Sequence, residues 1–72
     1  MRYEAHAAPT VGRAIREFRA AANMTQAELA GRAGVHRSYL SALENGKVTD
    51  ALEQIFALLH ALNVRVVLET SD

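Results

Sequence analysis

The side chains best suited to chemistry lie in the middle of the chain, between Gln26 and Leu43. Apolar residues recur there at helical spacing, and a set of polar or small residues falls on the opposite, exposed positions: His36, Arg37, Ser38, Ser41 and Ala42. These side chains are polar or small enough to enter a groove of DNA. The pattern favours a DNA-reading segment, and the alternative is a small helical hairpin with no nucleic-acid role.

The sequence offers few side chains for metal binding or catalysis. The chain contains no cysteine, which excludes disulfides, thiolate metal sites and cysteine nucleophiles. The three histidines, His6, His36 and His60, are too far apart in sequence to suggest a metal site. No serine stands in a recognisable arrangement with a histidine and a carboxylate. We therefore expect no enzyme activity, no metal and no cofactor.

The length of 72 residues allows one domain. A chain this short buries only about 60% of the surface that its unfolded form exposes, so its stability alone is marginal and oligomerisation is the expected support. The hydrophobic content of 50% is typical of a globular chain. No transmembrane stretch and no apolar signal-peptide core are evident, so we expect no membrane partner and a cytoplasmic location. A DNA-binding chain would there be associated with the bacterial nucleoid.

The charges are unevenly distributed although they sum to zero. The segment from Arg13 to Lys47 holds six basic and three acidic residues, a local excess of three positive charges, and the remainder carries the opposite excess. A basic middle with acidic ends is compatible with a nucleic-acid-binding face.

The elements that must position these residues can be predicted from caps and periodicity. The first nine residues have no period and are expected to form an arm ending at Pro9. Thr10 is then the expected N-cap of a first helix, because a helix rarely runs through a proline. Its apolar stripe is Val11, Ala14, Ile15, Phe18 and Ala22. Asn23 should end it, since asparagine tolerates the left-handed conformation.

Two short helices with a tight turn follow. Thr25-Gln-Ala-Glu28 is a capping box that opens the first of them, and Gly34 should end it. The next helix is expected from about His36 to Glu44, before the turn dipeptide Asn45-Gly46. Short helices joined in this way form a helix-turn-helix arrangement.

A fourth helix and a strand complete the chain. The helix should begin near Thr49 or Asp50, where Asp50-x-x-Glu53 has capping-box spacing, and end at Asn63. Its apolar stripe is Leu52, Ile55, Phe56, Leu59 and Leu62. The segment from Val64 to Glu69 is rich in β-branched residues and alternates apolar with charged positions, which predicts a strand.

The motifs resemble a known family. Thr25-Gln-Ala-Glu-Leu-Ala30, Gly34-Val35 and Leu43-Glu-Asn-Gly-Lys47 resemble the signature of the Xre (Cro/lambda-repressor type) helix-turn-helix family, and Ile15-Arg-Glu-Phe-Arg19 resembles its first helix. The resemblance spans roughly residues 11–63. The ending, Leu59 to Leu68, is similar to HipB-like antitoxins, whose C-terminal strand pairs across a dimer. Members of that group act as autorepressors and bind a serine/threonine kinase toxin of HipA type.

The resemblance implies a role for each matching residue. Arg37, Ser38, Ser41 and Ala42 would read base edges in the major groove, and Arg37 alone has the donor fork that fits guanine. Backbone contacts would come from Thr25, Gln26, Asn45 and Lys47, and His36 would touch the backbone or a flanking base. Arg19 and Glu44 match a pair that the family buries between the first and third helices, and are assigned to structure.

The strand carries a prediction about assembly. A lone strand is unstable in water, and the arm near Arg2 to His6 is short and weakly β-forming. We therefore expect the strand to pair with its copy across a two-fold axis, with Val64, Val66 and Leu68 over the fourth helices. The alternative is a frayed terminus covering the monomer's own core.

Together these observations predict an all-α, four-helix Xre-type helix-turn-helix domain with a short C-terminal strand. The expected divisions are an arm over 1–9, the helix-turn-helix domain over 10–63 and a dimerisation strand over 64–72. The expected function is sequence-specific repression at a palindromic operator by a homodimer, as the antitoxin of a HipB-like pair. The alternatives are a stand-alone or prophage repressor, or a protein-interaction module that has lost DNA binding.

Overall fold

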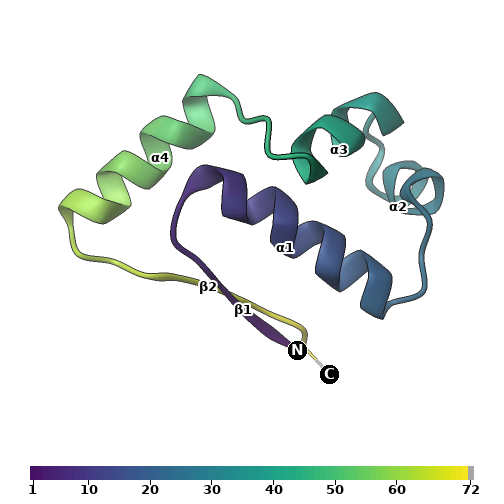
Figure 1. The fold of residues 1–72 in the computed structure, drawn as a ribbon, viewed down its shortest axis with the longest axis horizontal. Helices are drawn as coiled ribbons and strands as arrows, with labels where there is room; N and C mark the ends of the chain where they lie inside the picture. Colours follow the sequence, from purple (N-terminus) through teal and green to yellow (C-terminus); the bar gives the residue numbers. More distant parts are fainter. Residues whose placement is uncertain (72) are drawn as a thin grey trace.

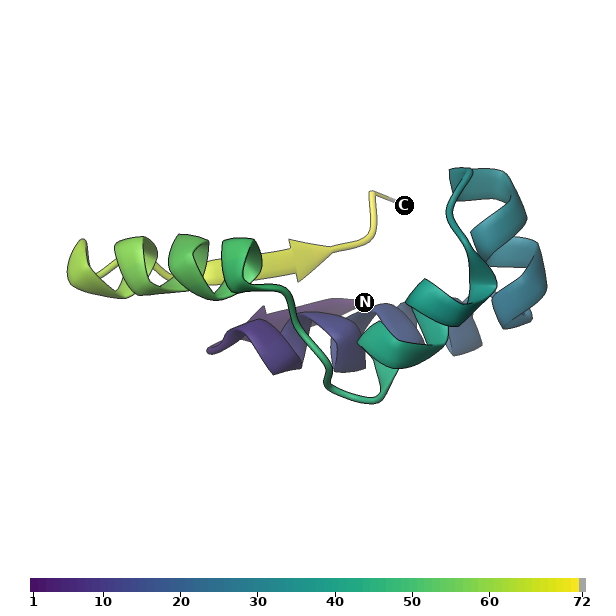
Figure 2. The same ribbon diagram turned by 90° about the horizontal axis from the view of Figure 1, so that it is seen from above.

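The computed structural model describes residues 1–71, so Asp72, the last residue of the expected terminal segment, lies outside the described part. The elements in chain order are β1 (Arg2–Ala5), α1 (Ala8–Ala21), α2 (Gln26–Ala33), α3 (Arg37–Glu44), α4 (Asp50–Ala61) and β2 (Val66–Glu69). Helix α1 runs through the middle, α2 and α3 lie at one end, α4 lies at the other, and the two strands pair beside α1 (Figures 1 and 2). The four predicted helices are confirmed.

The residues expected to begin and end the helices do so in most cases. Thr25 and Glu28 form the predicted capping box, in which each side chain bonds the backbone N–H of the other. Asn23 and Asn63 both adopt a φ of 57° directly after the C-caps of α1 and α4, and Gly34 adopts 71° after α2. These left-handed residues end each helix because they turn the chain out of the helical path.

The predicted start of α1 and the capping box suggested for α4 were wrong, whereas α4 begins at Asp50 as expected. Helix α1 begins at Ala8 with Ala7 as N-cap, so Pro9 lies within its first turn and Thr10 does not cap it. Proline is tolerated in the first turn, where its missing N–H would have had no helical partner. In α4 the cap is the Thr49 side chain, which accepts from the backbone N–H of Leu52, and not an Asp50-based box.

The N-terminal residues, which were expected to form an arm without periodic structure, contain a strand. Residues Arg2–Ala5 form β1, which pairs antiparallel with β2 in the register Tyr3 to Leu68 and Ala5 to Val66. Beyond this pairing the backbone N–H of Thr70 donates to the carbonyl of Met1 at 3.0 Å. The two chain ends therefore lie side by side.

This pairing gives β2 a partner within its own chain, in the segment that was expected to be too short and too weakly β-forming to pair. The strand begins at Val66, two residues later than predicted, and its neighbour is β1 of the same chain. Val66 and Leu68 pack over a cluster of Ala5, Ala8 and Phe56, so two of the three residues assigned to dimerisation cover the monomer's own core. Val64 precedes the strand and is exposed.

The core is small and divided between the two ends of α1. The cluster just described joins α4 and the strands to the start of α1, and His60 adds a hydrogen bond from its Nε2 to the carbonyl of His6 at 2.6 Å. At the other end Ala14, Ala30 and Leu40 are buried between α1, α2 and α3. Four of these six buried hydrophobic residues are alanines, so the core is made mainly by close backbone approach.

Gly12 makes the closest of these approaches possible. A Cβ atom at this position would lie 1.7 Å from the carbonyl oxygen of Leu43. Only a residue without a side chain allows α1 to lie directly against the last turn of α3. The glycine therefore fixes the distance between the first helix and the end of the third.

Candidate nucleic-acid interface

Helices α2 and α3 form the pair that carries most of the candidate residues. The turn between them contains Gly34 and Val35, whose N–H donates to the carbonyl of Ala30 at 3.0 Å. Val35 is exposed in this turn, with 41% of its surface accessible. Helix α1 packs against α3 (Figure 1), and Arg37, Ser38 and Tyr39 at the start of α3 are exposed.

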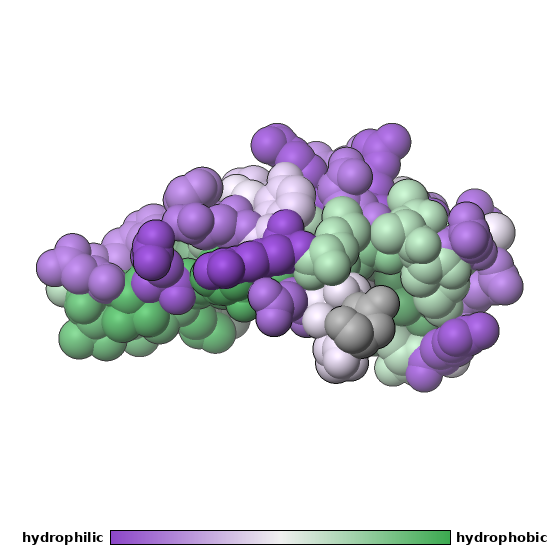
Figure 3. Space-filling model, turned by 90° about the horizontal axis from the view of Figure 1, so that it is seen from below, coloured by the Kyte–Doolittle hydropathy of each residue, from purple (hydrophilic) through white to green (hydrophobic). Residues whose placement is uncertain are grey.

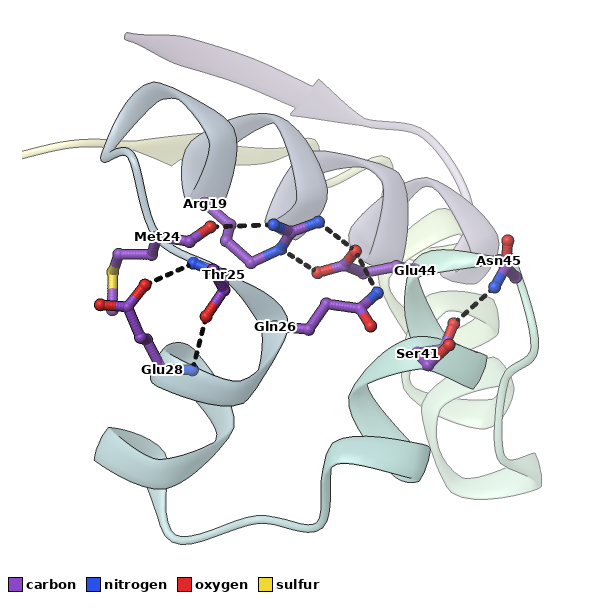
Figure 4. A network of polar contacts seen from close by, with 8 residues as sticks. All are labelled: Arg19, Met24, Thr25, Gln26, Glu28, Ser41, Glu44 and Asn45. Atoms are coloured by element: carbon purple, nitrogen blue, oxygen red, sulfur yellow. Dashed lines mark hydrogen bonds and ion pairs between the residues drawn. The ribbon is translucent and has the colours of Figure 1, made fainter.

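A polar network connects α1, α2 and α3 (Figure 4). Arg19 donates from Nε and Nη2 to the two carboxylate oxygens of Glu44, at 2.7 and 2.8 Å, and from Nη1 to the carbonyl of Met24 at 2.9 Å. The side chain of Glu44 is only 2% exposed, and that of Arg19 is 17% exposed. The two residues assigned to a structural pair from the sequence thus form a bidentate ion pair between α1 and the end of α3.

Gln26 belongs to the same network. Its side-chain amide donates to Glu44 Oε1 at 3.0 Å, which orients the first residue of α2 against the end of α3. The hydrogen bonds from Arg19 are the main reason that the pKa of Glu44 is lowered; burial opposes the shift, and Gln26 and the charge of Arg16 add to it. Glu44 is therefore a carboxylate at neutral pH, and it positions an amide that was expected to contact phosphate.

The start of α3 has its own local order. His36 is the N-cap, and its Nδ1 lies 2.8 Å from the hydroxyl of Ser38 and 3.4 Å from the Ser38 backbone nitrogen. Arg37, the first residue of the helix, is exposed, and it forms no ion pair with any residue of 1–71. Its donor fork is thus available to an external acceptor.

The far end of α3 places the remaining candidates near one another. Asn45 is the C-cap, and its side-chain amide donates to the carbonyl of Ser41 at 2.8 Å. Lys47 is exposed in the turn before α4, and Ala42 and Ser41 are partly buried. The expected base-edge and backbone residues therefore occupy one continuous region from the start of α2, along α3, to the following turn.

Sequence reasoning missed one exposed aromatic residue in this region. Tyr39 is 51% exposed on α3 and borders a shallow apolar groove of about 160 Å³ together with Ala42, Lys47 and Val48. Its position directly after Ser38 was the available signal, because an aromatic residue on the polar side of a short helix is unusual. Its hydroxyl is a further candidate for contact with a ligand that lies along α3.

Within residues 1–71, no helix has the length and apolar character needed to cross a membrane. The same residues contain no cluster of three or more His, Cys, Asp or Glu side chains with the geometry of a metal site.

The capped helix pair, its glycine turn and its accessible third helix define the class: this is a helix-turn-helix protein. Residues 15–68 match the Helix-turn-helix family. Two proteins of Archaeoglobus fulgidus, each described as an uncharacterized HTH-type transcriptional regulator, are 42% identical over 52 residues, which is 72% of this chain and 73% and 74% of theirs. No solved structure was found to match the chain.

The chain therefore belongs to the Helix-turn-helix family. The match agrees with the resemblance to Xre-type proteins inferred from the sequence, and it makes the protein a DNA-binding transcription regulator and not an enzyme.

Proposed function

We propose that this protein is a sequence-specific repressor that binds a palindromic double-stranded operator through α3. The observation that carries the proposal is Arg37, exposed at the first position of the accessible helix with its donor fork free of any ion pair within residues 1–71. A guanidinium in that place matches the O6 and N7 acceptors of guanine in the major groove. The neighbouring base-edge candidates are Ser38, Ser41 and Ala42.

Helices α2 and α3 and the turn after α3 also offer side chains for contacts to the sugar–phosphate backbone. Gln26 lies at the N-terminus of α2, where backbone N–H groups and the helix dipole favour an anion. Its amide has one N–H engaged by Glu44 and a second one left for a phosphate. Thr25, His36, Asn45 and Lys47 complete the set proposed for backbone contact.

The direct experiment is a titration of the protein with the DNA upstream of its own reading frame. A duplex from that region should bind more tightly than an unrelated duplex of equal length, and affinity for both should fall steeply as salt rises. Equal affinity for the two duplexes would contradict sequence-specific binding. No binding to either, at low salt, would favour a protein-interaction module.

An uncovered apolar face supports the proposed homodimer. Ile55 and Leu58 of α4 and its C-cap residue Leu62 are 51%, 66% and 70% exposed, and their spacing of i, i+3 and i+7 places them on one face. Val64 and Val67 are also exposed, at 45% and 38%, and hydrophobic surface gathers at the α4 end of the molecule in Figure 3. No large side chain in the described part is fully buried, so the monomer gains little from its own core. A second copy would cover this face and place two α3 helices on a palindrome.

The free edge of β2 supplies hydrogen-bonding groups for such a contact. In an antiparallel ladder, hydrogen-bonded residue pairs alternate with non-bonded pairs. Because Thr70 bonds Met1, the register of the strands directs the backbone N–H and C=O groups of Leu68 and Val66 toward β1. The groups of Val67 and Glu69 then point away from β1. We propose that β2 pairs there with its copy, which keeps the predicted two-fold contact but moves it to the outer edge.

Two proline substitutions separate this edge from the inner one. Val67→Pro should shift the protein toward monomer in sedimentation while the monomer stays folded, because proline removes only an outward-facing N–H. Val66→Pro should instead lower the unfolding midpoint, because it removes a bond to β1. A Val67→Pro variant that remains fully dimeric would place the interface elsewhere.

An antitoxin role is the finer proposal, supported by the resemblance of the α4–β2 ending to HipB-like proteins. In that case the protein would repress its own promoter, act in the cytoplasm at the nucleoid and bind a HipA-type serine/threonine kinase. A kinase reading frame next to this one, whose product forms a complex with this protein in vitro, is the expected finding. A neighbourhood without such a frame would favour the stand-alone or prophage repressor.

A further inference from the structure

Two arginines of α1 lie beside the candidate interface without belonging to it. Because Gly12 allows α1 to touch the carbonyl of Leu43, the next residues of α1 stand directly next to the turn that follows α3. Arg13 and Arg16 line a polar hollow of about 440 Å³ there, together with Asn45 and Gly46. Positions i and i+3 share one face of a helix, so the two guanidinium groups can reach one ligand.

The charges around the hollow leave it positive. Its lining includes two carboxylates, Glu17 and Glu44. Glu44 is already neutralised by the bidentate contact with Arg19, so Glu17 alone opposes Arg13 and Arg16. Both arginines are exposed, and neither forms an ion pair in the described chain.

The hollow also adjoins residues already proposed to contact the DNA backbone. Asn45 is part of its lining, and Gln26 bonds Glu44, the carboxylate at its inner wall. The charge of Arg16 acts on that same carboxylate, which agrees with a position near the α2 terminus. Pro9, in the first turn of α1, also lines the same hollow.

We propose that Arg13 and Arg16 bind a phosphate of the DNA backbone, between the phosphates contacted by Gln26 and by Asn45. The contact extends the footprint from the helix-turn-helix onto α1, and it deepens the DNA-binding function on which it rests. The ligand is a phosphodiester and not a base, because α1 lies behind α3, the helix proposed to enter the groove. Such a contact adds affinity equally for all sequences.

The test is the salt dependence of DNA binding by the full-length double variant Arg13→Gln/Arg16→Gln. If each protomer of a dimer loses one phosphate contact, the slope of log K against log salt should become shallower by about 1.8. Between 50 and 200 mM salt this amounts to a roughly 12-fold smaller loss of affinity. The ratio of affinities for operator and unrelated duplex should stay unchanged.

A control variant removes the same charge elsewhere. Arg2→Gln/Arg32→Gln changes two exposed arginines that do not line the hollow, so its slope should match that of the wild type. Equal slopes for both double variants and the wild type would overturn the phosphate contact, while binding by the wild type would leave the proposed function intact. A wild type that binds no DNA would refute the function itself.

A free anion is the competing occupant. Inorganic phosphate titrated at constant ionic strength should leave the side-chain NMR signals of Arg13 and Arg16 unshifted in the low millimolar range, whereas a duplex should shift them. Saturable shifts with inorganic phosphate alone, without shifts on adding DNA, would assign the hollow to a small anion and overturn the proposal.

Discussion

Removing one member of the Arg19–Glu44 pair should cost much more than removing both. In Arg19→Met the Glu44 carboxylate, whose side chain is 2% exposed, keeps only the hydrogen bond from Gln26 at 3.0 Å. A buried carboxylate that loses its cation typically costs about 3–5 kcal/mol. This is a large part of the stability expected for so short a chain.

The partner variants should behave differently. Glu44→Met leaves Arg19 with the Met24 carbonyl and with access to water, so its loss should be smaller than that of Arg19→Met. The double variant buries two apolar side chains of similar length and leaves no unpaired charge, so it should be more stable than Arg19→Met. Urea unfolding followed by far-UV circular dichroism measures all four proteins. Losses that simply add in this double-mutant cycle would refute the interaction.

Three further outcomes follow from the packing, the caps and the carboxylates. Gly12→Ala should destabilise the protein by about 3 kcal/mol in urea unfolding, because α1 must move off α3. The control Gly31→Ala places its new Cβ where nothing lies within 4 Å, so it should stabilise by about 0.5–1 kcal/mol. Equal effects of the two substitutions would contradict the close approach of α1 to α3. Thr49→Ala should cost about 1 kcal/mol by removing the cap of α4, and an unchanged unfolding midpoint would argue against that cap. The pKa values of Glu44 and Glu28 are both lowered in the folded state. The unfolded chain therefore binds more protons below about pH 4.3, and the free energy of unfolding should fall there as pH decreases. A Glu44→Gln variant that keeps the full acid dependence would contradict this assignment.

The helices could be predicted because their signals are local. A capping box, a left-handed Asn or Gly and an apolar stripe each act within a few residues, and these features define α2 and the ends of α1 and α4 as expected. The start of α1 was missed for a related reason, since the first turn tolerates a proline that the helix interior does not.

The sheet could not be predicted in the same way. Strand β1 has four residues, of which Tyr3 and Ala5 turn inward, and so short an alternation is not distinguishable from chance. Its pairing with β2 joins residues more than sixty positions apart, and no local signal reports that distance. The same holds for Gly12, whose importance depends on the carbonyl of Leu43 in another helix.

The residues of the candidate site were predicted from the sequence motif, whereas their geometry was largely not predicted. The ion pair of Arg19 and Glu44 came from the resemblance, and the structure adds that Gln26 bonds the same carboxylate. The hollow beside Arg13 and Arg16 depends on how α1 packs on α3, which the sequence does not reveal.

The central claim is that α3 reads DNA sequence. Its most direct test is the ratio of two Kd values, one for the upstream operator and one for an unrelated duplex. The ratio is measured for the wild type, Arg37→Ala and Lys47→Ala. Loss of the guanidinium should weaken operator binding by about 1–3 kcal/mol per half-site, or about 5- to 150-fold, and change non-specific binding much less, so the ratio should fall. Lys47→Ala should weaken both duplexes by the same factor and leave the ratio unchanged. An Arg37→Ala variant with the wild-type ratio would contradict the assignment of α3 as the reading helix.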